Sequence, residues 1–385
     1  MDIILFTHPD FLPSQSMPRF ANMLIEGMQS RGHSVQIWSP NPYFYKLPFP
    51  ATFRKWLGYI DQYLIFPAQV KRKLRLENKK QLFVFADQAL GPWVPLVAHL
   101  PHVIHCHDFL AQASAMGQYK INPTSRTGKI YQKLIRDGYS KGRNFISVSR
   151  KTQDDLHKFL PAKPGVSEVV YNGLNQKYKL LEPIQAGTTF QNHIGIDIHD
   201  GFILHVGGNQ WYKNRLGVIA IYNAWRSIKR MANIPLLLIG ETPDSTLKDA
   251  QQASEFKNDI HFLVGITDDQ VRNAYASASV FLFPSIAEGF GWPIAEAMAS
   301  GTLVITTKDA PMTEVGGDAA FYIPNYNGDF DSWAKESAEQ LETVLNLSQS
   351  LKEDQKNRAF NHIKMFDAEL AINQIEKVYL DVFSK

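Results

Sequence analysis

Residues 283–301 read FPSIAEGFGWPIAEAMASG, and this stretch predicts a strand end, a loop and a short helix. It includes the end of the apolar run at 280–283, which has the length and composition of a buried strand. Pro293 stands where a first helical residue is expected, and Gly301 stands just past the expected helix end. The glycine-rich loop lets backbone approach a ligand closely, and the free N–H groups at the helix start favour an anion such as a diphosphate. The stretch therefore predicts an anion site at the carboxyl end of a strand.

Two carboxylates accompany this loop. Glu288 lies before the helix and Glu296 lies within it. A carboxylate can accept two hydrogen bonds from a vicinal diol, so one glutamate can bind a ribose and the other a second sugar. The alternative is a strand–turn–helix with a purely structural role. The density of loop and capping signals favours the ligand site.

Short apolar runs alternate with helical patterns along the chain, as βαβ units require. Strands are expected at 3–6, 34–38, 82–85, 102–105, 144–148 and 169–171, and again at 202–206, 236–239, 261–264, 280–283 and 303–306. Between the two series, a polar stretch of about 175–200 has no clear period and is expected to be a linker. The sequence thus predicts an α/β protein with two Rossmann-like, doubly wound parallel-sheet domains and with ligands at the carboxyl ends of the strands.

The composition suits two domains of ordinary size. The chain has 385 residues, of which 44% are hydrophobic and 20% charged. A formal net charge of +3 excludes an overall polyanion-binding character, so no nucleic-acid partner is expected. Cys106 is the only cysteine, which excludes an internal disulfide and a cysteine-rich metal site and fits a reducing, cytoplasmic setting. We expect neither a signal segment nor a membrane span, because no apolar run is long enough.

One segment interrupts the alternation of strands and helices. Residues 43–80 mix aromatic side chains with a basic cluster at 71–75. An amphipathic helix that covers the first sheet is the favoured interpretation, because βαβ crossovers need such helices. The alternative is a helix that docks on a membrane surface or on an acceptor, so peripheral membrane contact through the first domain stays open.

The run His105-Cys106-His107-Asp108 ends a strand of the first domain. Residues two apart on a strand share a face, so the two histidines could hold a metal ion. No further Cys or His clusters nearby, and no metal site is expected. Cys106 points to the opposite face and is interpreted as a small buried apolar residue.

Several segments resemble one large enzyme family. Residues 288–301 are similar to the signature of the retaining glycosyltransferases of the GT-B fold, family 4 (glycosyl transferases group 1). Residues 265–269 and 275–280 are similar to the strand, loop and helix that precede this signature, and residues 313–319 are similar to the segment after it. Residues 170–175 are similar to an Asn-Gly turn that closes the family's first domain. The resemblance covers the second domain nearly throughout and the first in patches.

The resemblance implies a domain arrangement. Residues 1–180 would form the acceptor-side domain and 200–365 the domain that binds the nucleotide sugar, with a central cleft between them. Residues 366–385 would form a helix that crosses back onto the first domain. Its apolar face is expected at Leu370, Ala371, Ile375, Val378 and Tyr379. The alternative is a helix that simply caps the second domain.

The resemblance also implies site residues. Glu296 matches the glutamate that holds the ribose hydroxyls, and Glu288 matches the one that contacts the transferred sugar. Lys213 matches a lysine that neutralises the diphosphate, and His107 would lie in the cleft, where its ring can hydrogen-bond the sugar or acceptor. His107, Glu288 and Lys213 are thus the expected catalytic residues. The expected donor-binding residues are Ser16, Gly208, Asn209, Lys213, Asn214, Gly265, Ile266, Glu288, Gly289, Phe290, Gly291, Trp292 and Glu296.

The chain departs from the family's pattern at two loops. Many members carry an arginine where this chain has Gly208-Asn209, so either Lys213 acts with less help or Arg215 substitutes. Many members have paired glycines after the first strand, where this chain reads SQSMPR at 14–19. The contact of Ser16 with a donor depends on that loop.

The implied activity is transfer of a sugar, with retention, from a UDP- or GDP-linked donor to a glycan or lipid-linked acceptor in polysaccharide biosynthesis. The resemblance implies no cofactor beyond the donor substrate and no divalent ion. A sugar-nucleotide epimerase or hydrolase of the same fold is an alternative, as is a non-catalytic partner subunit. A dehydrogenase is disfavoured, because Gly-x-Gly-x-x-Gly follows neither domain's first strand.

Overall fold

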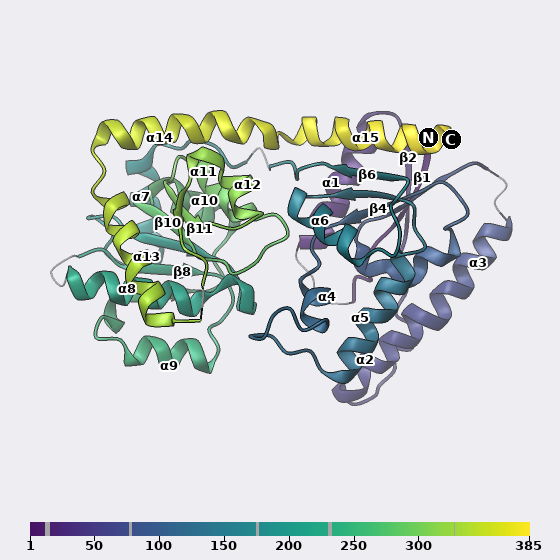
Figure 1. Ribbon diagram of the computed structural model, residues 1–385, viewed down its shortest axis with the longest axis horizontal. Helices are drawn as coiled ribbons and strands as arrows, with labels where there is room; N and C mark the ends of the chain where they lie inside the picture. Colours follow the sequence, from purple (N-terminus) through teal and green to yellow (C-terminus); the bar gives the residue numbers. More distant parts are fainter. Residues whose placement is uncertain (12–15, 77–78, 175–176, 230–232, 327) are drawn as a thin grey trace. The chain divides into compact units, whose positions relative to one another are not determined.

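The structure, a computed structural model, describes the chain except for residues 12–15, 77–78, 175–176, 230–232 and 327. The side chains of Ser16 and Ala51 are also outside the described part of the chain. The chain divides into two compact units (Figure 1). The first consists of Met1–Asn172 together with Glu369–Lys385, and the second of Gly173–Ala368. The sequence places these boundaries at about 180, 200 and 366.

The first unit is built on a parallel six-stranded sheet. Its strands are β1 (Asp2–Phe6), β2 (Ser34–Trp38), β3 (Leu82–Phe85), β4 (His102–Cys106), β5 (Asn144–Ser147) and β6 (Val166–Val169). They lie in the order β2-β1-β3-β4-β5-β6, with Ile4 of β1 opposite Gln36 on one side and Phe83 on the other. The strand order reverses between β1 and β3, and a doubly wound sheet binds ligands at such a switch point.

Helices cover both faces of this sheet (Figure 1). They are α1 (Ser16–Ser30), α2 (Ala51–Ile60), a π-helical turn η1 (Asp61–Ile65), α3 (Phe66–Leu76), η2 (Gln88–Leu96), α4 (Leu110–Ala115), α5 (Arg126–Tyr139) and α6 (Arg150–Phe159). Alternate strand residues point to opposite faces. Ile3 and Leu5 pack with α1 and the C-terminal helix, whereas Ile4 and Phe6 pack with α3, η2 and α5.

The segment at 43–80 covers the sheet, as the favoured interpretation expects. The elements α2, η1 and α3 follow one another without a break, and Phe66 and Val70 are buried in the core beside β1. Asp61 anchors the preceding loop, because its carboxylate accepts the backbone N–H groups of Phe44 and Tyr45 at 2.9 Å.

The C-terminal helix α15 (Ala368–Ser384) belongs to the first unit from Glu369 onward. Its buried side chains are Ala371, Ile372, Ile375, Val378, Tyr379 and Val382. They pack against residues of β1, β3 and α1, and the Tyr379 hydroxyl hydrogen-bonds His105 Nε2 at 2.6 Å. The prediction that Leu370 shares this face is wrong, since Leu370 is 42% exposed. It lies about 140° around the helix from the centre of the buried stripe, at about 100° per residue.

The second unit has its own parallel six-stranded sheet. Its strands are β7 (Ile203–Val206), β8 (Leu236–Ile239), β9 (Ile260–Leu263), β10 (Val280–Phe283), β11 (Val304–Thr307) and β12 (Phe321–Ile323). The order β12-β11-β10-β7-β8-β9 is that of dinucleotide-binding domains, and it reverses between β7 and β10. The two parallel sheets confirm the predicted α/β fold class.

The helices of the second unit include one within the stretch that was expected to be a linker. They are α7 (Pro183–Ile194), η3 (Trp211–Lys213), α8 (Arg215–Ile228), α9 (Ser245–Ala253), η4 (Lys257–Asp259), α10 (Asp268–Ser277), α11 (Trp292–Ala299), α12 (Met312–Gly316), η5 (Gly317–Ala319), α13 (Phe330–Leu345), α14 (Gln349–His362) and η6 (Ile363–Phe366). Helix α7 occupies much of the expected linker. The helical periodicity of apolar residues in its sequence is weak, because Ala186 and Phe190 are its only buried residues. Glu182 caps it and Gly195 ends it in a left-handed conformation.

Two strand predictions also need correction. The strand expected at 169–171 is β6, which spans Val166–Val169. Because β6 has no fully buried residue, the hydropathy pattern predicted the strand too far toward the C-terminus. The short edge strand β12 was not predicted. With three residues it is shorter than the runs of about four to eight residues by which a strand is found in a sequence.

Candidate active site

A lysine and a glutamate meet at the switch point of the second sheet. Lys213 ends the turn η3 after β7, and Glu288 lies in the loop after β10, beside β7 in the sheet. Lys213 Nζ lies 2.8 Å from Glu288 Oε1 and 3.1 Å from Oε2. The Ser285 hydroxyl donates a third hydrogen bond to Oε1 at 2.7 Å. Both charged side chains are largely buried, at 15% and 7% exposure, so water screens their interaction little.

Asn214 holds the two loops of this site together. It has a left-handed backbone, with φ of 52°, and its Oδ1 caps α8 by accepting the N–H of Gly217 at 3.1 Å. Its Nδ2 donates to the carbonyl of Pro284 at 3.0 Å. Asn214, an expected donor-binding residue, thus uses its side chain to set the position of Lys213 relative to the loop of Glu288.

Helix α11 begins beside Glu288. Gly291 precedes it with φ of 101°, a conformation that favours glycine, and no described side chain caps its first turn. Pro293 is the second helical residue, one position later than expected. Ile294 donates its N–H to the carbonyl of Gly291 at 3.0 Å, and the helix dipole places positive potential at this point. Phe290 is buried, and its ring lies 5.5 Å from that of Trp292.

Glu296 lies one turn into α11 and has its own partner. It is 7% exposed, and its Oε2 accepts a hydrogen bond from the Tyr275 hydroxyl at 3.3 Å. Burial raises the pKa of Tyr275 well above its usual value, and the negative charge of Glu296 raises it further. Tyr275 therefore stays protonated and donates. Both predicted glutamates thus come from one βα unit, although only Glu288 contacts Lys213.

Arg215 contacts the loops after β7 and β8. Arg215 is 3% exposed and donates to Asn209 Oδ1 and, at 3.0 Å, to the carbonyl of Glu241. Asn209 also donates to Glu241 Oε2 and to the carbonyl of Thr242, at 3.0 and 2.7 Å. These bonds join the loops after β7 and β8. Arg215 therefore supports the loop from within, and Lys213 is the cation that contacts Glu288.

Glycines let these two loops approach each other. A Cβ on Gly240, whose φ is 154°, would lie 2.0 Å from the carbonyl oxygen of Gly207. Gly208 lies between Gly207 and Asn209 in this tight arrangement, where a Cβ would meet the flexible side chain of Gln210 at 2.5 Å. Only glycine at 240 permits this backbone contact.

Gly265 and Ile266 follow β9, two strands away from β7. Gly265 has φ of 74° and is exposed, and Ile266 is half-buried. Thr267 begins α10 with a reciprocal cap, in which Gln270 Oε1 accepts the N–H of Thr267 at 2.8 Å. Within the described part of the chain, no hydrogen bond is found between these residues and the pair of Lys213 and Glu288.

His107 lies at the carboxyl end of β4 in the first unit. Its Nε2–H donates to the carbonyl of Ala86 at 2.8 Å, and its ring packs edge-on against Phe20 at 4.4 Å. Burial lowers the pKa of His107, which favours a neutral ring with Nδ1 as the acceptor. His105 bonds Tyr379, and burial lowers its pKa to about 3. Ser16 begins α1, but its side chain lies outside the described residues.

A second polar pair in the first unit was missed by the sequence reasoning. His8 follows β1 and Asp87 follows β3, and His8 Nε2 lies 2.8 Å from Asp87 Oδ2. Burial would raise the pKa of Asp87, but the hydrogen bond and charge of His8, with that of His107, hold it below its usual value. The available signal was a polar residue two positions after the end of each of two buried strands.

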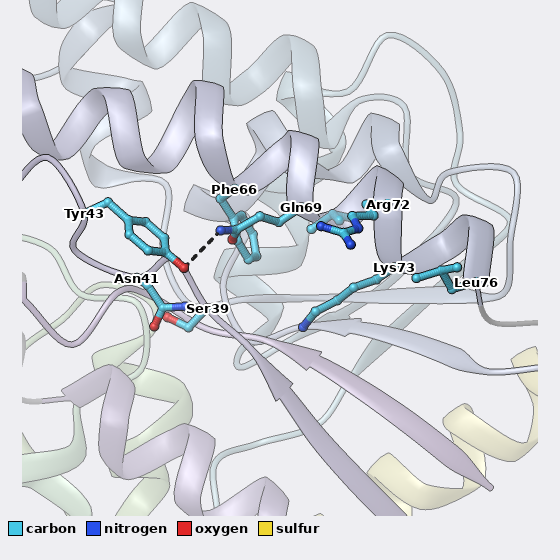
Figure 2. Close-up of a pocket in the computed structure, with 9 residues that line it drawn as sticks. Ser39, Asn41, Tyr43, Phe66, Gln69, Arg72, Lys73 and Leu76 are labelled. Carbon is cyan, nitrogen blue, oxygen red and sulfur yellow. Dashed lines mark hydrogen bonds between the residues drawn. The ribbon is translucent and has the colours of Figure 1, made fainter.

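A pocket of about 380 Å³ opens beside the carboxyl end of β2 (Figure 2). Along α3 its lining mixes apolar side chains with the basic Arg72 and Lys73, and Ser39 and Asn41 face it from the loop after β2 (Figure 2). The residues that line it are Ser39, Asn41, Tyr43, Phe66, Gln69, Val70, Arg72, Lys73 and Leu76. Gln69 Nε2 donates to the Tyr43 hydroxyl at 3.3 Å, and the Lys73 ammonium lies 4.6 Å from the centre of the Trp38 ring.

Neither a metal cluster nor a membrane span was found where the structure describes the chain. No described group of three or more His, Cys, Asp and Glu residues is placed to hold a metal ion. The Asp-x-Asp spacing at 329–331 lies at the start of α13, where Asp329 caps the helix by accepting the N–H of Ser332. No described helix is long and apolar enough to cross a membrane.

Comparisons with known proteins agree with this architecture. Residues 189–361 match the family model "Glycosyl transferases group 1", and 17–178 match "Glycosyltransferase Family 4". The chain is 33% identical over 121 residues to O-antigen chain mannosyltransferase B of Escherichia coli, covering 31% of this chain and 32% of that protein. It is 25% identical to O-antigen chain mannosyltransferase RfbU of Salmonella typhimurium, over 58% of this chain and 59% of that one. The matches therefore span less than two thirds of either relative.

Solved structures show the same fold along almost the whole chain. The crystal structure of HepE from Anabaena in complex with UDP and glucose superposes with a TM-score of 0.71. It covers 98% of each chain at 16% identity. At that identity the likeness establishes the GT-B fold and leaves the substrate open.

Proposed function

We propose that this chain, a GT-B protein whose two halves match glycosyltransferase family models, transfers a sugar from a UDP- or GDP-linked donor to a glycan or lipid-linked acceptor. The observation that carries the proposal is the pair of Lys213 and Glu288 at the switch point of the second sheet, beside the start of α11. A cation and a helix N-terminus at this place favour a diphosphate, and a neighbouring carboxylate favours sugar hydroxyls.

The diphosphate of the donor would compete with Glu288 for Lys213. In the described structure the ammonium is held by both carboxylate oxygens. When a diphosphate binds at the start of α11, Lys213 can turn to its oxygens, and Glu288, still held by Ser285, gains an acceptor site for a sugar hydroxyl. The ion pair would thus keep both groups in position before the donor arrives.

The chemical step needs charge stabilisation more than acid–base work. As the bond between the sugar and the diphosphate breaks, the sugar becomes oxocarbenium-like and negative charge grows on the leaving diphosphate. Lys213 and the first turn of α11 would stabilise that charge. Retention at the anomeric carbon and independence of divalent ions are part of the proposal, and both rest on the family resemblance.

The proposal is tested by following the donor and the product. The protein would be incubated with UDP-glucose, UDP-N-acetylglucosamine and GDP-mannose, each with p-nitrophenyl glycosides as acceptors and with EDTA. We expect one donor to yield a glycoside whose anomeric proton signal has the donor's configuration. Release of free sugar alone would indicate a hydrolase, and a product of inverted configuration would refute retention. If none of the three donors gave a product, transfer from these nucleotides would be contradicted.

Glu296→Ala should weaken nucleotide binding. The proposed role of Glu296 is to hold the ribose, and loss of a charged hydrogen-bond partner costs on the order of 1.5–3 kcal/mol, about a 10- to 150-fold rise in Kd. Calorimetry with UDP and GDP would measure the change. Tyr275→Phe is the matched control, because it removes the hydroxyl that contacts Glu296 but leaves the carboxylate. Unchanged affinity in a folded Glu296→Ala variant would remove Glu296 from the site.

We also propose that the first unit contacts an anionic membrane through α2 and α3. Phe53 and Trp56 of α2 are 56% and 60% exposed, and the pocket beside α3 is lined by Arg72 and Lys73. Exposed aromatic rings with basic side chains bind the interface of anionic bilayers. We expect the protein to float with phosphatidylglycerol vesicles at low salt, and Trp56→Ala with Lys73→Glu to reduce the floated fraction at least about fivefold. Equal flotation of the variant would refute this surface.

A further inference from the structure

Ser285 is a buried serine whose hydroxyl contacts the glutamate that would bind the donor's sugar. It lies two residues after β10 and is 0% exposed. Its hydroxyl donates to Glu288 Oε1 at 2.7 Å. A hydrogen bond to an ionised carboxylate is stronger than one between neutral groups. A hydroxyl has one hydrogen to donate, so the Ser285 side chain is committed to this carboxylate.

The backbone that carries Ser285 is held from two directions. Its carbonyl accepts a hydrogen bond from the hydroxyl of Thr307, at 2.7 Å, and Thr307 belongs to the neighbouring strand β11. The N–H of Ile286 donates to the carbonyl of Tyr212 at 2.8 Å, and Tyr212 belongs to the turn η3 that also carries Lys213. Because the backbone is held and the side chain is buried, the serine hydroxyl can only rotate about one bond. Ser285 therefore cannot follow a partner that moves away.

The two oxygens of Glu288 differ in their partners. Oε1 accepts hydrogen bonds from Lys213 and Ser285, at 2.8 and 2.7 Å. Among the described residues, Oε2 accepts a hydrogen bond only from Lys213, at 3.1 Å. When Lys213 turns to a diphosphate, Oε1 keeps the serine and Oε2 is left without this donor. A buried carboxylate oxygen needs a hydrogen-bond donor, so a sugar hydroxyl is favoured at Oε2.

We propose that Ser285 is a positioning residue that keeps the Glu288 carboxylate at the donor's sugar while Lys213 turns to the diphosphate. The inference rests on the proposed transfer function, and it assigns Oε2 of Glu288 to a hydroxyl of the transferred sugar. Without the serine hydroxyl, the carboxylate can follow the ammonium, because the two charges still attract each other. The sugar then loses its acceptor, while the nucleotide keeps its proposed contacts with α11. Ser285 thus determines how well the sugar is bound, with little effect on the nucleotide.

Calorimetry with nucleotides that carry or lack the sugar tests this division. UDP, UDP-glucose, UDP-N-acetylglucosamine, GDP and GDP-mannose would each be titrated into the wild type and into Ser285→Ala. For the sugar nucleotide that the wild type binds, we expect Kd to rise at least about fivefold in the variant, because a bond to a charged group is weakened. Kd for the matching UDP or GDP should change less than about twofold, which also shows that the variant is folded. Equal changes in the two Kd values, or no change in either, would overturn the proposal.

A double-mutant cycle tests whether Ser285 acts through Glu288. Glu288→Ala removes the carboxylate, so a further Ser285→Ala substitution has no carboxylate left to misplace. We expect the double variant to bind the sugar nucleotide within about twofold of Glu288→Ala alone. A serine that only stabilised the loop would add its full effect in both backgrounds, and that result would overturn the positioning role.

Ser254→Ala is the matched control. Ser254 is 7% exposed in the same unit, and its hydroxyl donates to Asn223 Oδ1 at 2.6 Å. We expect this variant to change neither Kd, and a change as large as that of Ser285→Ala would overturn the proposal. Failure of the proposed function looks different. If the wild type binds a donor but transfers no sugar, the proposed activity is refuted, while the two Kd values still decide the role of Ser285. If the wild type binds none of the three donors, both proposals are refuted.

Discussion

Lys213→Ala is expected to slow sugar transfer at least about a hundredfold, with a smaller effect on the KM for the donor. Charge on the leaving diphosphate grows as the bond breaks, so the lysine stabilises the transition state more than the bound donor. A preorganised hydrogen-bond donor in a water-poor site lowers the activation free energy by on the order of 3 kcal/mol. Lys213 is 15% exposed and its backbone is fixed by the turn that Asn214 ends, so only its ammonium has to move from Glu288 to the diphosphate.

The variant also leaves Glu288 without its cation, and this effect must be separated from catalysis. A buried carboxylate that loses its partner destabilises the fold. Lys213→Ala with Glu288→Gln removes both charges and should recover folding stability but not turnover. Lys229→Ala is the matched control, because Lys229 Nζ forms a 2.8 Å ion pair with Glu342 in the same unit. Steady-state kinetics would give kcat and KM separately. If KM alone rises, Lys213 is a clamp for the ground state and its proposed role is wrong.

The fold class could be predicted because its signals are local and repeated. Buried parallel strands appear as short apolar runs, and those of β7, β8 and β10 were found within a residue of their bounds. Glu288 was chosen because it lies in the glycine-rich loop after such a run, and Lys213 was chosen through the family resemblance. The carboxyl ends of parallel strands meet at one edge of the sheet, and the strand order then makes β7 and β10 neighbours.

The contacts that determine how the site works could not be predicted in the same way. Asn209 was expected to bind the donor, and nothing in the sequence indicated that three of its polar atoms bond to Arg215, Glu241 and Thr242. Such bonds depend on the approach of two loops that are about 30 residues apart in the chain. The pairing of His8 with Asp87 spans an even longer separation and belongs to no motif.

Removal of the C-terminal helix is the second large expected effect. A chain that ends at Asp367 keeps Phe366, which packs against Phe290 in the second unit, but lacks α15, whose Ile372, Ile375 and Val378 are buried in the core of the first unit. A large apolar side chain contributes about 1.5–3 kcal/mol when buried, so the five large residues of this face contribute on the order of 10 kcal/mol. That is comparable with the whole stability of a typical domain, about 5–15 kcal/mol. We expect the truncated chain to lose transfer while its second unit still binds UDP.

Two single substitutions on α15 test whether the loss comes from this packing. Ile375→Ala should lower the free energy of unfolding of the first unit by about 2–5 kcal/mol, because it leaves a cavity beside β1 and β3. Leu370→Ala is the matched control on the exposed side of α15 and should change the free energy of unfolding by less than about 0.5 kcal/mol. Urea unfolding with and without UDP distinguishes the unfolding transitions of the two units, because only the transition of the UDP-binding unit should shift with nucleotide. A truncated chain that keeps transfer, or equal effects of the two substitutions, would mean that α15 does not stabilise the first unit through this buried face.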